Sequence, residues 1–385
     1  MSVRVEVRPQ MFQWARARSG IDDESWLRRF PRYDDWVAGG VVPTLKQLDD
    51  FARKTHTPVG FLLLDEPPVE IVPIPDFRTL GDRGVGSDGT TPSADLLDVI
   101  YLCQTRQEWY RDHQLLNGEA ALAFVGSASL RDAVVDVAVR MRELLDWNPT
   151  SRAGCRTRDA ALTWLREHAE TAGVLVMISG IVGGDTHRTL DTQEFRGFAL
   201  ADRYSSVVFV NGADSKAAQI FTLVHELAHL WLGESALSDL DASSVQGNAV
   251  ERWCNQVAAE LLVPMAEFRD FIDQAVRPQP QEMAEHFRVS TQMILGRMRE
   301  AGLLTWIEYL TELDIERQRF AAIDVRASSG GNYYNTKPVQ VGKRFARALV
   351  ASALEGRTSY TEAFRLLGLK KAATFDRLAE RLGVL

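Results

Sequence analysis

Two histidines and the glutamate beside the first could bind a metal ion and catalyse hydrolysis with it. The sequence reads His-Glu-Leu-Ala-His from His225 to His229, so the imidazoles are four residues apart. On a helix such residues share a face and can bind one ion, while Glu226 lies about 100° round the axis. Catalytic zinc takes three protein ligands and keeps one position for water, whose pKa it lowers to about 7. The spacing therefore predicts that His225 and His229 bind Zn²⁺ and that Glu226 is the general base.

The alternative is that two of the seven histidines fall at this spacing by chance on an apolar helix. Average residue frequencies put this outcome at about one random chain of this length in a hundred. An ionisable group on a buried helix is also costly unless it has a partner or a metal. We therefore prefer the metal interpretation, because these apolar residues surround the motif: Phe221, Leu223, Val224, Leu227, Ala228, Leu230 and Leu232.

The third ligand must come from a neighbouring element. Glu251 lies on the next predicted helix, and Asn255 follows one turn later on the same face. We predict that Glu251 is the third ligand and that Asn255 accepts a hydrogen bond from the second nitrogen of a ligand histidine. Cys254 is interpreted as a small buried hydrophobic residue. The residues considered for the third ligand are Glu234, Asp239, Asp241, Glu251, Cys254 and Glu260.

Short strands and helices around the motif predict an α+β fold. Helices are predicted from about 215 to 233, around the motif, and from about 247 to 262, ending before Pro264. The strands would form a short antiparallel or mixed sheet in a chain that is otherwise mainly helical. The three strands, all before the motif, are predicted at residues 175–178, 195–200 and 207–210.

The chain is long enough for two or three compact domains, since domains usually hold about 100 to 200 residues. Prolines and glycines between residues 65 and 92 interrupt regular structure and predict a linker. The predicted parts are a helical domain at 1–65, the linker at 66–92, a helical segment at 93–148, the zinc-site domain at 149–270, a helical unit at 271–327 and a basic helical tail at 328–385.

Charge and cysteine content narrow the class of protein. The net charge of −8 argues against a chain coated in nucleic acid. Residues 337–385 hold 10 Lys and Arg against 4 Asp and Glu, which suits contact with phosphate or an acidic partner, or a solvated surface.

The three cysteines form no CxxC pair, and neither a signal sequence nor an apolar stretch of about 20 residues is present. These features predict a cytoplasmic protein without a membrane partner.

Three segments around the motif resemble the ImmA/IrrE family of metallopeptidases. They are Phe-Thr-Leu-Val-His-Glu-Leu-Ala-His-Leu at 221–230, Phe-Arg-Gly-Phe-Ala-Leu at 195–200 and the segment 251–264. The resemblance covers about residues 150 to 270 and implies a thermolysin-like zinc peptidase domain. It implies that both motif histidines and Glu251 bind zinc and that the motif glutamate is the general base. Such regulatory proteases cut repressors, and some belong to toxin–antitoxin or phage-related operons.

The implied reaction is hydrolysis of a peptide bond in a protein partner such as a repressor or a toxin-system component. Glu226 would take a proton from water and return it to the leaving amine. The substrate backbone could pair with an exposed edge strand, and we predict that Arg196, Gly197 and Phe198 belong to it. Candidate donors to the oxyanion are Tyr204, His187, Arg188 and Arg196.

Residues 1–65 resemble a helix-turn-helix domain of the XRE type. The resemblance rests on the segments 14–20 and 36–48. A recognition helix carries Arg, Lys, Asn or Gln toward base edges, whereas the corresponding stretch 32–36 offers Arg32 and two aspartates. The domain would therefore contact DNA through Arg32, or else contact a protein.

Two further segments resemble parts of this architecture. Asp76-Phe77-Arg78-Thr79 matches an element that follows the first domain, and residues 281–304 are similar to a small helix-turn-helix-like unit within 271–327. The second possible function is an antitoxin or transcriptional regulator that binds DNA or a cognate toxin, with a structural or inactive metal site. The intact Glu226 favours the enzyme, because a structural zinc site has no need of that carboxylate.

Overall fold

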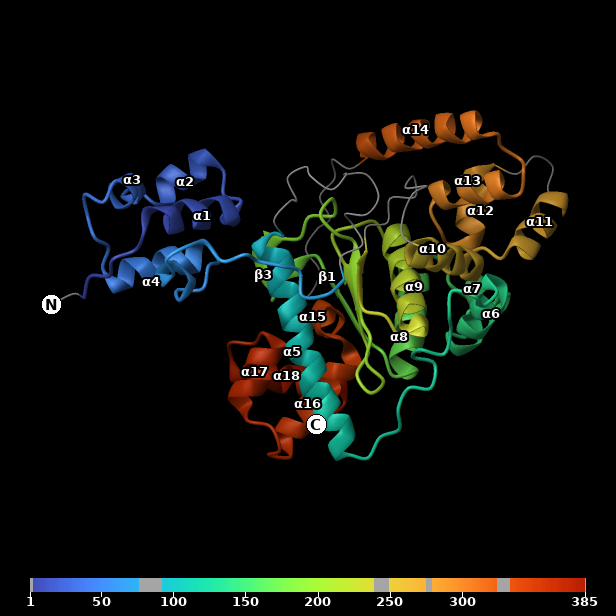
Figure 1. Ribbon diagram of the computed structural model, residues 1–385. Coiled ribbons are helices and arrows are strands. Elements are labelled where there is room, and N and C mark those ends of the chain that lie inside the picture. The colour runs from blue at the N-terminus through green and yellow to red at the C-terminus, as the bar shows by residue number, and fades with distance from the viewer. Residues whose placement is uncertain (1–2, 76–91, 239–248, 275–278, 324–332, 385) are drawn as a thin grey trace. The chain divides into compact units, whose positions relative to one another are not determined.

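The computed structural model describes residues 3–75, 92–238, 249–274, 279–323 and 333–384 (Figure 1). The chain divides into two compact units. The first comprises Met1–Pro73 and Gly86–Tyr101, and the second comprises Ile74–Val85 and Leu102–Leu385. Within the described ranges, no helix is long and apolar enough to cross a membrane.

The first unit contains a small group of helices around an aromatic core. These are α1 (Pro9–Ser19), α2 (Asp23–Arg29), α3 (Tyr33–Val37), α4 (Leu45–Lys54) and the 3-10 helix η1 (Phe61–Leu63). Phe51 of α4 lies at the centre of the core, because its ring centroid is 5.0 Å from that of Phe30 and 5.3 Å from that of Phe12. The ring centroids of Trp26 and Trp36 each lie 6.0 Å from that of Phe51. Aromatic pairs at these distances add to the stabilisation that comes from burial alone.

A four-stranded mixed sheet forms the centre of the second unit. Its strands in spatial order are β1 (Leu175–Ser179), β5 (Val207–Asn211), β4 (Gly197–Leu200) and β6 (Ala236–Ser238). β1 and β5 are parallel, and the other two pairings are antiparallel. A separate hairpin pairs β2 (Ile181–Val182) with β3 (Asp185–Thr189). A small mixed sheet in a mainly helical chain confirms the α+β class.

Four helices lie in layers on one side of this sheet (Figure 1). They are α6 (Val134–Leu144), α8 (Arg158–Thr171), α9 (Lys216–Leu232) and α10 (Ala249–Leu262). α8 and α9 lie against the strands, with α10 and α6 behind α9, because α9 contacts β4 and β5, α8 contacts β1, and α10 contacts α9 and α6. The hydroxyl of Ser215 caps the start of α9 by accepting a hydrogen bond from the N–H of Ala218, and Gly233 ends it in the left-handed region. These caps set where α9 begins and ends.

The other face of the sheet is covered by one helix that precedes the strands in the sequence and by helices that follow them. They are α5 (Ala94–Leu116), α15 (Tyr333–Val341) and α16 (Lys343–Leu354), followed by α17 (Tyr360–Leu367) and α18 (Ala372–Leu382). Gln107 of α5 donates hydrogen bonds to the carbonyls of Leu200 and Ser205, at 2.9 and 3.0 Å. Gly342 lies so close to β1 that a Cβ atom there would be 3.2 Å from the carbonyl oxygen of Val176. The sheet is therefore buried on both faces, which explains its continuous apolar strands.

The remaining helices of the second unit are α7 (Pro149–Gly154), α11 (Met265–Gln274), α12 (Pro280–Phe287), α13 (Thr291–Glu300) and α14 (Trp306–Ile323). Phe287 and Ile294 belong to the same buried core as the apolar residues of α9 and α10. Arg297 of α13 forms an ion pair with Glu260 of α10, with an N···O distance of 2.5 Å. α12 and α13 are thus packed against the helices that follow the sheet.

Candidate metal centre

Helix α9 carries the three motif residues into the interior of the second unit. His225, Glu226 and His229 each have 0% of their surface exposed. The next helix, α10, brings Glu251 to the same place with 8% exposed. Buried ionisable groups need partners of opposite charge or a metal, because desolvation otherwise disfavours their charged forms. The contacts among these four residues therefore decide what the site can do.

The donor atoms of His225, His229 and Glu251 form a close triangle. The two Nε2 atoms lie 3.1 Å apart. Nε2 of His225 lies 3.1 Å from Oε2 of Glu251, and Nε2 of His229 lies 3.1 Å from Oε1. Among the described residues, these three form the group of His, Cys, Asp and Glu side chains that could hold a metal ion. The structure thus brings together the three residues that the sequence predicts as ligands.

The triangle fits a zinc ion. Zinc binds nitrogen and oxygen ligands at about 2.0–2.2 Å, so a tetrahedral site separates its ligand atoms by roughly 3.3–3.6 Å. The distances of 3.1 Å are close to this spacing. Two imidazole nitrogens this close need a proton or a cation between them, since each neutral ring otherwise presents a lone pair. Two imidazoles and one carboxylate are also a donor set found in zinc hydrolases.

Electrostatics favour an ionised carboxylate beside a neutral imidazole. Burial raises the pKa of the Glu251 carboxyl, but its hydrogen bonds with His225 and His229 lower that pKa more, and the result lies well below the usual range. Burial lowers the pKa of His229, and this outweighs the effect of its hydrogen bond with Glu251. Metal binding requires these protonation states, because a ligand must offer a lone pair to the ion.

Gly197 on β4 lets the sheet approach Glu226 closely. A Cβ atom at this position would lie 3.2 Å from Oε1 of Glu226 and 2.5 Å from Cγ2 of Thr222. It would also lie 2.8 Å from the carbonyl oxygen of Phe209. A side chain is therefore excluded here. Sequence reasoning missed this role, although a glycine inside a strand pattern often marks close approach of another element.

The prediction that residues 196–200 form an exposed edge strand is wrong. β4 lies inside the sheet, because it pairs with β5 on one side and with β6 on the other. Phe198 is fully buried, and Nε of Arg196 lies 3.7 Å from Oδ2 of Asp214. Within the described part of the chain, β6 is the outer strand on this side, and the N–H of Leu237 donates to the carbonyl of Pro75 at 2.9 Å. The sequence did not reveal this order because β6 has only three residues.

Asn255 does not make the predicted hydrogen bond with a ligand histidine. Its Oδ1 is buried and has no hydrogen-bond partner within the described chain, and neither does Nδ1 of His225, which would be the donor. Cys254 is fully buried, as interpreted from the sequence. Burial raises the pKa of its thiol well above the usual range, and the nearby carboxylates of Glu251 and Glu226 raise it further. A neutral thiol in this position packs as a small apolar group.

The candidate oxyanion donors come from two places in the second unit, the β3 hairpin and the two ends of β4. Tyr204 follows β4 in the turn to β5, at the end of β4 opposite Gly197, and its N–H donates to Asp202. His187 and Arg188 lie on β3 of the separate hairpin, where His187 is exposed. Of these candidates, Arg196 is the one next to Gly197, which approaches Glu226, so the structure does not favour Tyr204, and the role of His187 stays a prediction. Of the other residues considered as ligands, Glu260 pairs with Arg297, Glu234 is exposed, and Asp239 and Asp241 lie outside the described residues.

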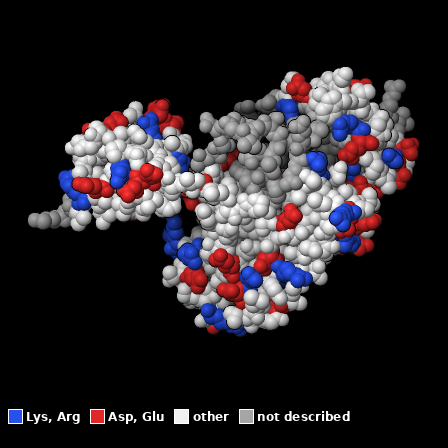
Figure 2. Space-filling view, viewed as in Figure 1, with Lys and Arg blue, Asp and Glu red and all other residues white. Residues whose placement is uncertain are grey.

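Arg32 lies in the first unit, where it is the N-cap residue of α3 and is exposed. Tyr33 and Trp36 of that helix are buried in the aromatic core, which leaves Asp34 and Asp35 exposed beside Arg32. Acidic and basic side chains are interspersed on the visible face of this unit (Figure 2). The segment Asp76-Phe77-Arg78-Thr79 lies outside the described residues.

Comparisons with protein families match two parts of the second unit. Residues 341–381, which cover α16, α17 and all but the last residue of α18, match a domain of unknown function, DUF8813. Comparison with curated proteins gave no match. Residues 169–299 match the Peptidase M78 family, described as an IrrE N-terminal-like domain. The match contains the strands, the motif helix and Glu251, so it supports the resemblance to the ImmA/IrrE family and a metallopeptidase-type fold for these residues.

Proposed function

We propose that this chain is a zinc-dependent metallo-endopeptidase that hydrolyses a peptide bond in a protein partner. The observation that carries the proposal is the triangle of His225, His229 and Glu251 donor atoms with edges of 3.1 Å. Glu226 next to the first ligand supplies the carboxylate that hydrolysis requires and that a structural site does not need. The match to a peptidase family over residues 169–299 supports the same conclusion.

The chain's residues would divide the reaction between them. His225, His229 and Glu251 would hold the zinc ion, which when bound lowers the pKa of water and polarises a carbonyl group. Glu226 would accept a proton from the attacking water at its carboxylate. The water oxygen joins the peptide carbonyl carbon, and the carbon–nitrogen bond breaks. Glu226 would then donate its proton to the leaving amine.

β6 is the strand that we propose for pairing with the substrate backbone. It is the outer strand of the sheet on the side of β4, and β4 reaches Glu226 at Gly197. Extended peptides commonly add to such an outer strand through backbone hydrogen bonds. The N–H of Leu237 is already bonded to Pro75, so a substrate would have to displace that residue to use the same donor.

The partner that we propose is a transcriptional repressor or a toxin-system component, with the first unit contacting DNA or protein.

A second function is favoured by the complete burial of His225, Glu226 and His229. A substrate carbonyl has to reach a catalytic metal, whereas a structural site is closed. The second candidate is therefore an antitoxin or transcriptional regulator whose metal site is structural or inactive.

The decisive experiment compares the wild-type protein with Glu226→Gln. Metal content is measured for both, and both are incubated with the proteins encoded by neighbouring genes. The peptidase is supported if the wild type cleaves one of them and Glu226→Gln retains zinc without cleaving. A wild type that binds zinc and cleaves none of these proteins would favour the regulator.

The role of the first unit needs a separate measurement. A mobility-shift assay at moderate salt on the upstream region of the gene compares the wild type with Arg32→Ala and with Arg29→Ala. Arg29 is a matched control, because it is also exposed on a helix of this unit. A specific complex that only Arg32→Ala weakens supports DNA contact through Arg32. No specific complex for the wild type would make the unit a protein-contact module.

A further inference from the structure

The outer strand of the sheet on the side of β4 already has an occupant within the described chain. The N–H of Leu237 in β6 donates to the carbonyl of Pro75 at 2.9 Å. Ile74 and Pro75 belong to the second unit, although they precede all of its strands in the sequence. We call these two residues the strap. The strap therefore takes the edge of β6 that would otherwise be open to another chain.

The strap lies beside the strands that reach the motif glutamate. Ser238 of β6 is the register partner of Gly197 in β4, and Leu237 is the partner of Phe198. A Cβ atom at Gly197 would lie 3.2 Å from Oε1 of Glu226. A peptide that paired with β6 at Leu237 would lie level with this part of β4. The strap thus occupies the place of that peptide.

Ile74 anchors the strap in the second unit. Only 8% of its surface is exposed, whereas Ile71 is 72% exposed and Val69 is 87% exposed. Burial of an apolar side chain stabilises a contact roughly in proportion to the area that is removed from water. The attachment is therefore stronger at the strap than at these two residues before it.

Pro75 makes this attachment weaker than ordinary strand pairing. In an antiparallel sheet the N–H and C=O groups of one residue point to the same side, so the outer edge of Leu237 offers one donor and one acceptor. The carbonyl of Pro75 uses the donor. Proline has no N–H group with which to use the acceptor. A peptide residue with an N–H group could use both and would compete with the strap.

The metal centre is closed while the strap is bound. His225, Glu226 and His229 each have 0% of their surface exposed. A peptide carbonyl must nevertheless reach the metal for hydrolysis to occur. A closed site and an occupied outer strand therefore occur in the same state of the protein.

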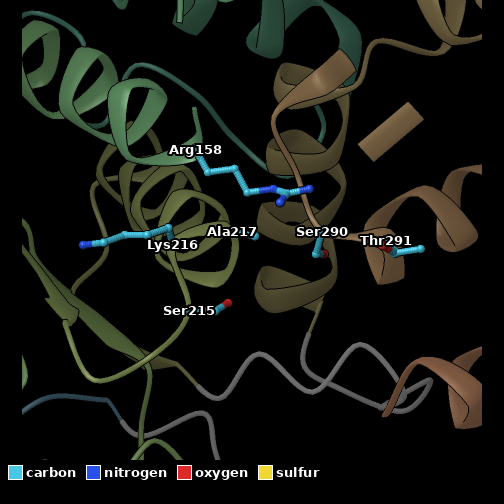
Figure 3. Close-up of a pocket in the computed structure, with 6 residues that line it drawn as sticks. All are labelled: Arg158, Ser215, Lys216, Ala217, Ser290 and Thr291. Atoms are coloured by element: carbon cyan, nitrogen blue, oxygen red, sulfur yellow. The ribbon is translucent and has the colours of Figure 1, made fainter. Parts of the chain in front are cut away.

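A cavity of about 330 Å³ in the second unit does not provide an entrance to this centre (Figure 3). It lies at the starts of α8, α9 and α13, and no metal-centre residue lines it. From Lys216 to His225 the helix rises about 14 Å, at about 1.5 Å per residue. The substrate therefore needs another route, which the outer strand offers. The residues that line the cavity are Arg158, Ser215, Lys216, Ala217, Ser290 and Thr291.

We propose that the strap is an autoinhibitory segment, which holds the outer edge of β6 until an extended protein segment displaces it. The inference rests on the proposed peptidase function. A substrate residue with an N–H group opposite Leu237 forms two hydrogen bonds where the strap forms one, so substrates without proline at that position are favoured. The strap returns after the products leave, because it belongs to the same chain and is present at high effective concentration.

The first measurement is hydrogen exchange of the Leu237 amide in the full-length protein, followed by NMR. An amide that is released by local opening exchanges faster than one inside a sheet, so Leu237 should exchange at least about tenfold faster than Val208 of β5. Ile74→Ser should accelerate exchange at Leu237 by about another tenfold. Ile71→Ser is the matched control, because it removes the same side chain from an exposed position. It should leave the rate within about twofold of the wild type.

The second measurement is cleavage by the zinc-loaded proteins. The wild type, Ile74→Ser and Ile71→Ser are incubated with the proteins encoded by neighbouring genes and with unfolded casein. We expect Ile74→Ser to cleave at least about threefold faster than the other two, because its open state is more populated. Adding Glu226→Gln to Ile74→Ser should abolish cleavage, which excludes a contaminating protease.

Other results would overturn the inference. Exchange at Leu237 as slow as at Val208 in the wild type would show that the strap does not leave β6, and this comparison needs no variant. Equal effects of Ile74→Ser and Ile71→Ser on exchange would remove the anchor. Melting curves check that both variants fold.

The two measurements also separate the strap from the peptidase. Faster exchange in Ile74→Ser with unchanged cleavage would refute autoinhibition, while the peptidase would stand. Faster exchange without cleavage of any protein by the wild type or by Ile74→Ser would refute the peptidase, and the inference with it.

Discussion

Gly197 of β4 faces Glu226 of α9 with no side chain between them, and a Cβ atom there would lie 3.2 Å from Oε1 of Glu226. The same atom would lie 2.8 Å from the carbonyl oxygen of Phe209, which belongs to the backbone and cannot move alone. We therefore expect Gly197→Ala to lower the free energy of unfolding by about 1–3 kcal/mol, the usual cost of overpacking. Urea denaturation measures the change.

Gly154→Ala is the control for this substitution. A Cβ atom at Gly154 meets nothing within 4 Å, and its φ lies outside the left-handed region. Its unfolding free energy should stay within about 0.5 kcal/mol of the wild type. If Gly197→Ala is as stable as Gly154→Ala, β4 does not approach α9 as closely as described.

Metal binding should stabilise the second unit through Glu251. An ion that binds only the folded state at one hundred times its Kd adds about 2.7 kcal/mol of stability. Zinc added after chelation should therefore raise the melting temperature of the wild type by several degrees. Glu251→Gln should abolish most of this shift, because it removes one of three ligand side chains. Glu234→Gln is the matched control, since Glu234 is exposed, and a full loss of the shift in that variant would contradict the site.

Lys337 of α15 should make the free energy of unfolding change with pH in the alkaline range. Burial, and to a smaller extent the charge of Arg106, lowers the pKa of its ammonium group from 10.5 to about 8. Between pH 8 and 10.5 the unfolded chain holds a proton that the folded chain has lost, so this residue contributes stability that rises with pH in that window. The increase is at most about 1.4 kcal/mol per pH unit.

The measurement is the difference in unfolding free energy between the wild type and Lys337→Met at several pH values. Cys103 acts in the opposite direction, because burial raises the pKa of its thiol to about 12 and the unfolded chain loses that proton first. Both proteins contain Cys103, so its effect cancels in the difference. We expect the unfolding free energy of the wild type to increase relative to that of Lys337→Met as the pH rises from 8 to 10. A difference that is constant with pH would show that Lys337 is not buried.

Phe345 of α16 should be essential for covering the second face of the sheet. It is fully buried, and its ring centroid lies 5.7 Å from that of Trp109 on α5. Phe345→Ala should lower the unfolding free energy by about 3–5 kcal/mol, because it removes a large buried side chain. Leu116→Ala on α5 is the control, since Leu116 is 88% exposed and should change the stability by less than about 0.5 kcal/mol. Equal effects of the two substitutions would mean that α16 does not pack as described.

The triangle of His225, His229 and Glu251 could be predicted because these residues lie close together in the sequence. Two imidazoles four residues apart meet on any helix, and Glu251 lies on the next helix of the chain. The same local patterns located β1, β5, α9 and α10 to within two residues. Strand order was not predictable, since β4 became an inner strand only through pairing with β6, whose three residues carry no periodic signal.

Contacts between distant segments were also beyond sequence reasoning. The apolar stripe of α16 shows that one face is buried, but a stripe does not identify the surface that covers it. A cavity lined by Arg158, Ser215 and Thr291 has no sequence signature either, because these residues come from three helices far apart in the chain. Packing of whole helices brings them together.

The order of segments in the chain affects how this protein is synthesised. The helices with the metal triangle end at Leu262, while α16, which helps to cover the other face of the sheet, begins roughly 80 residues later. At about 5–20 residues per second, a ribosome takes several seconds to make that interval. During this time the residues of the strands and of the motif helix have been made, but those of α16 have not. The apolar surface of β1 that α15 and α16 cover would then be accessible to a chaperone until these two helices leave the ribosome.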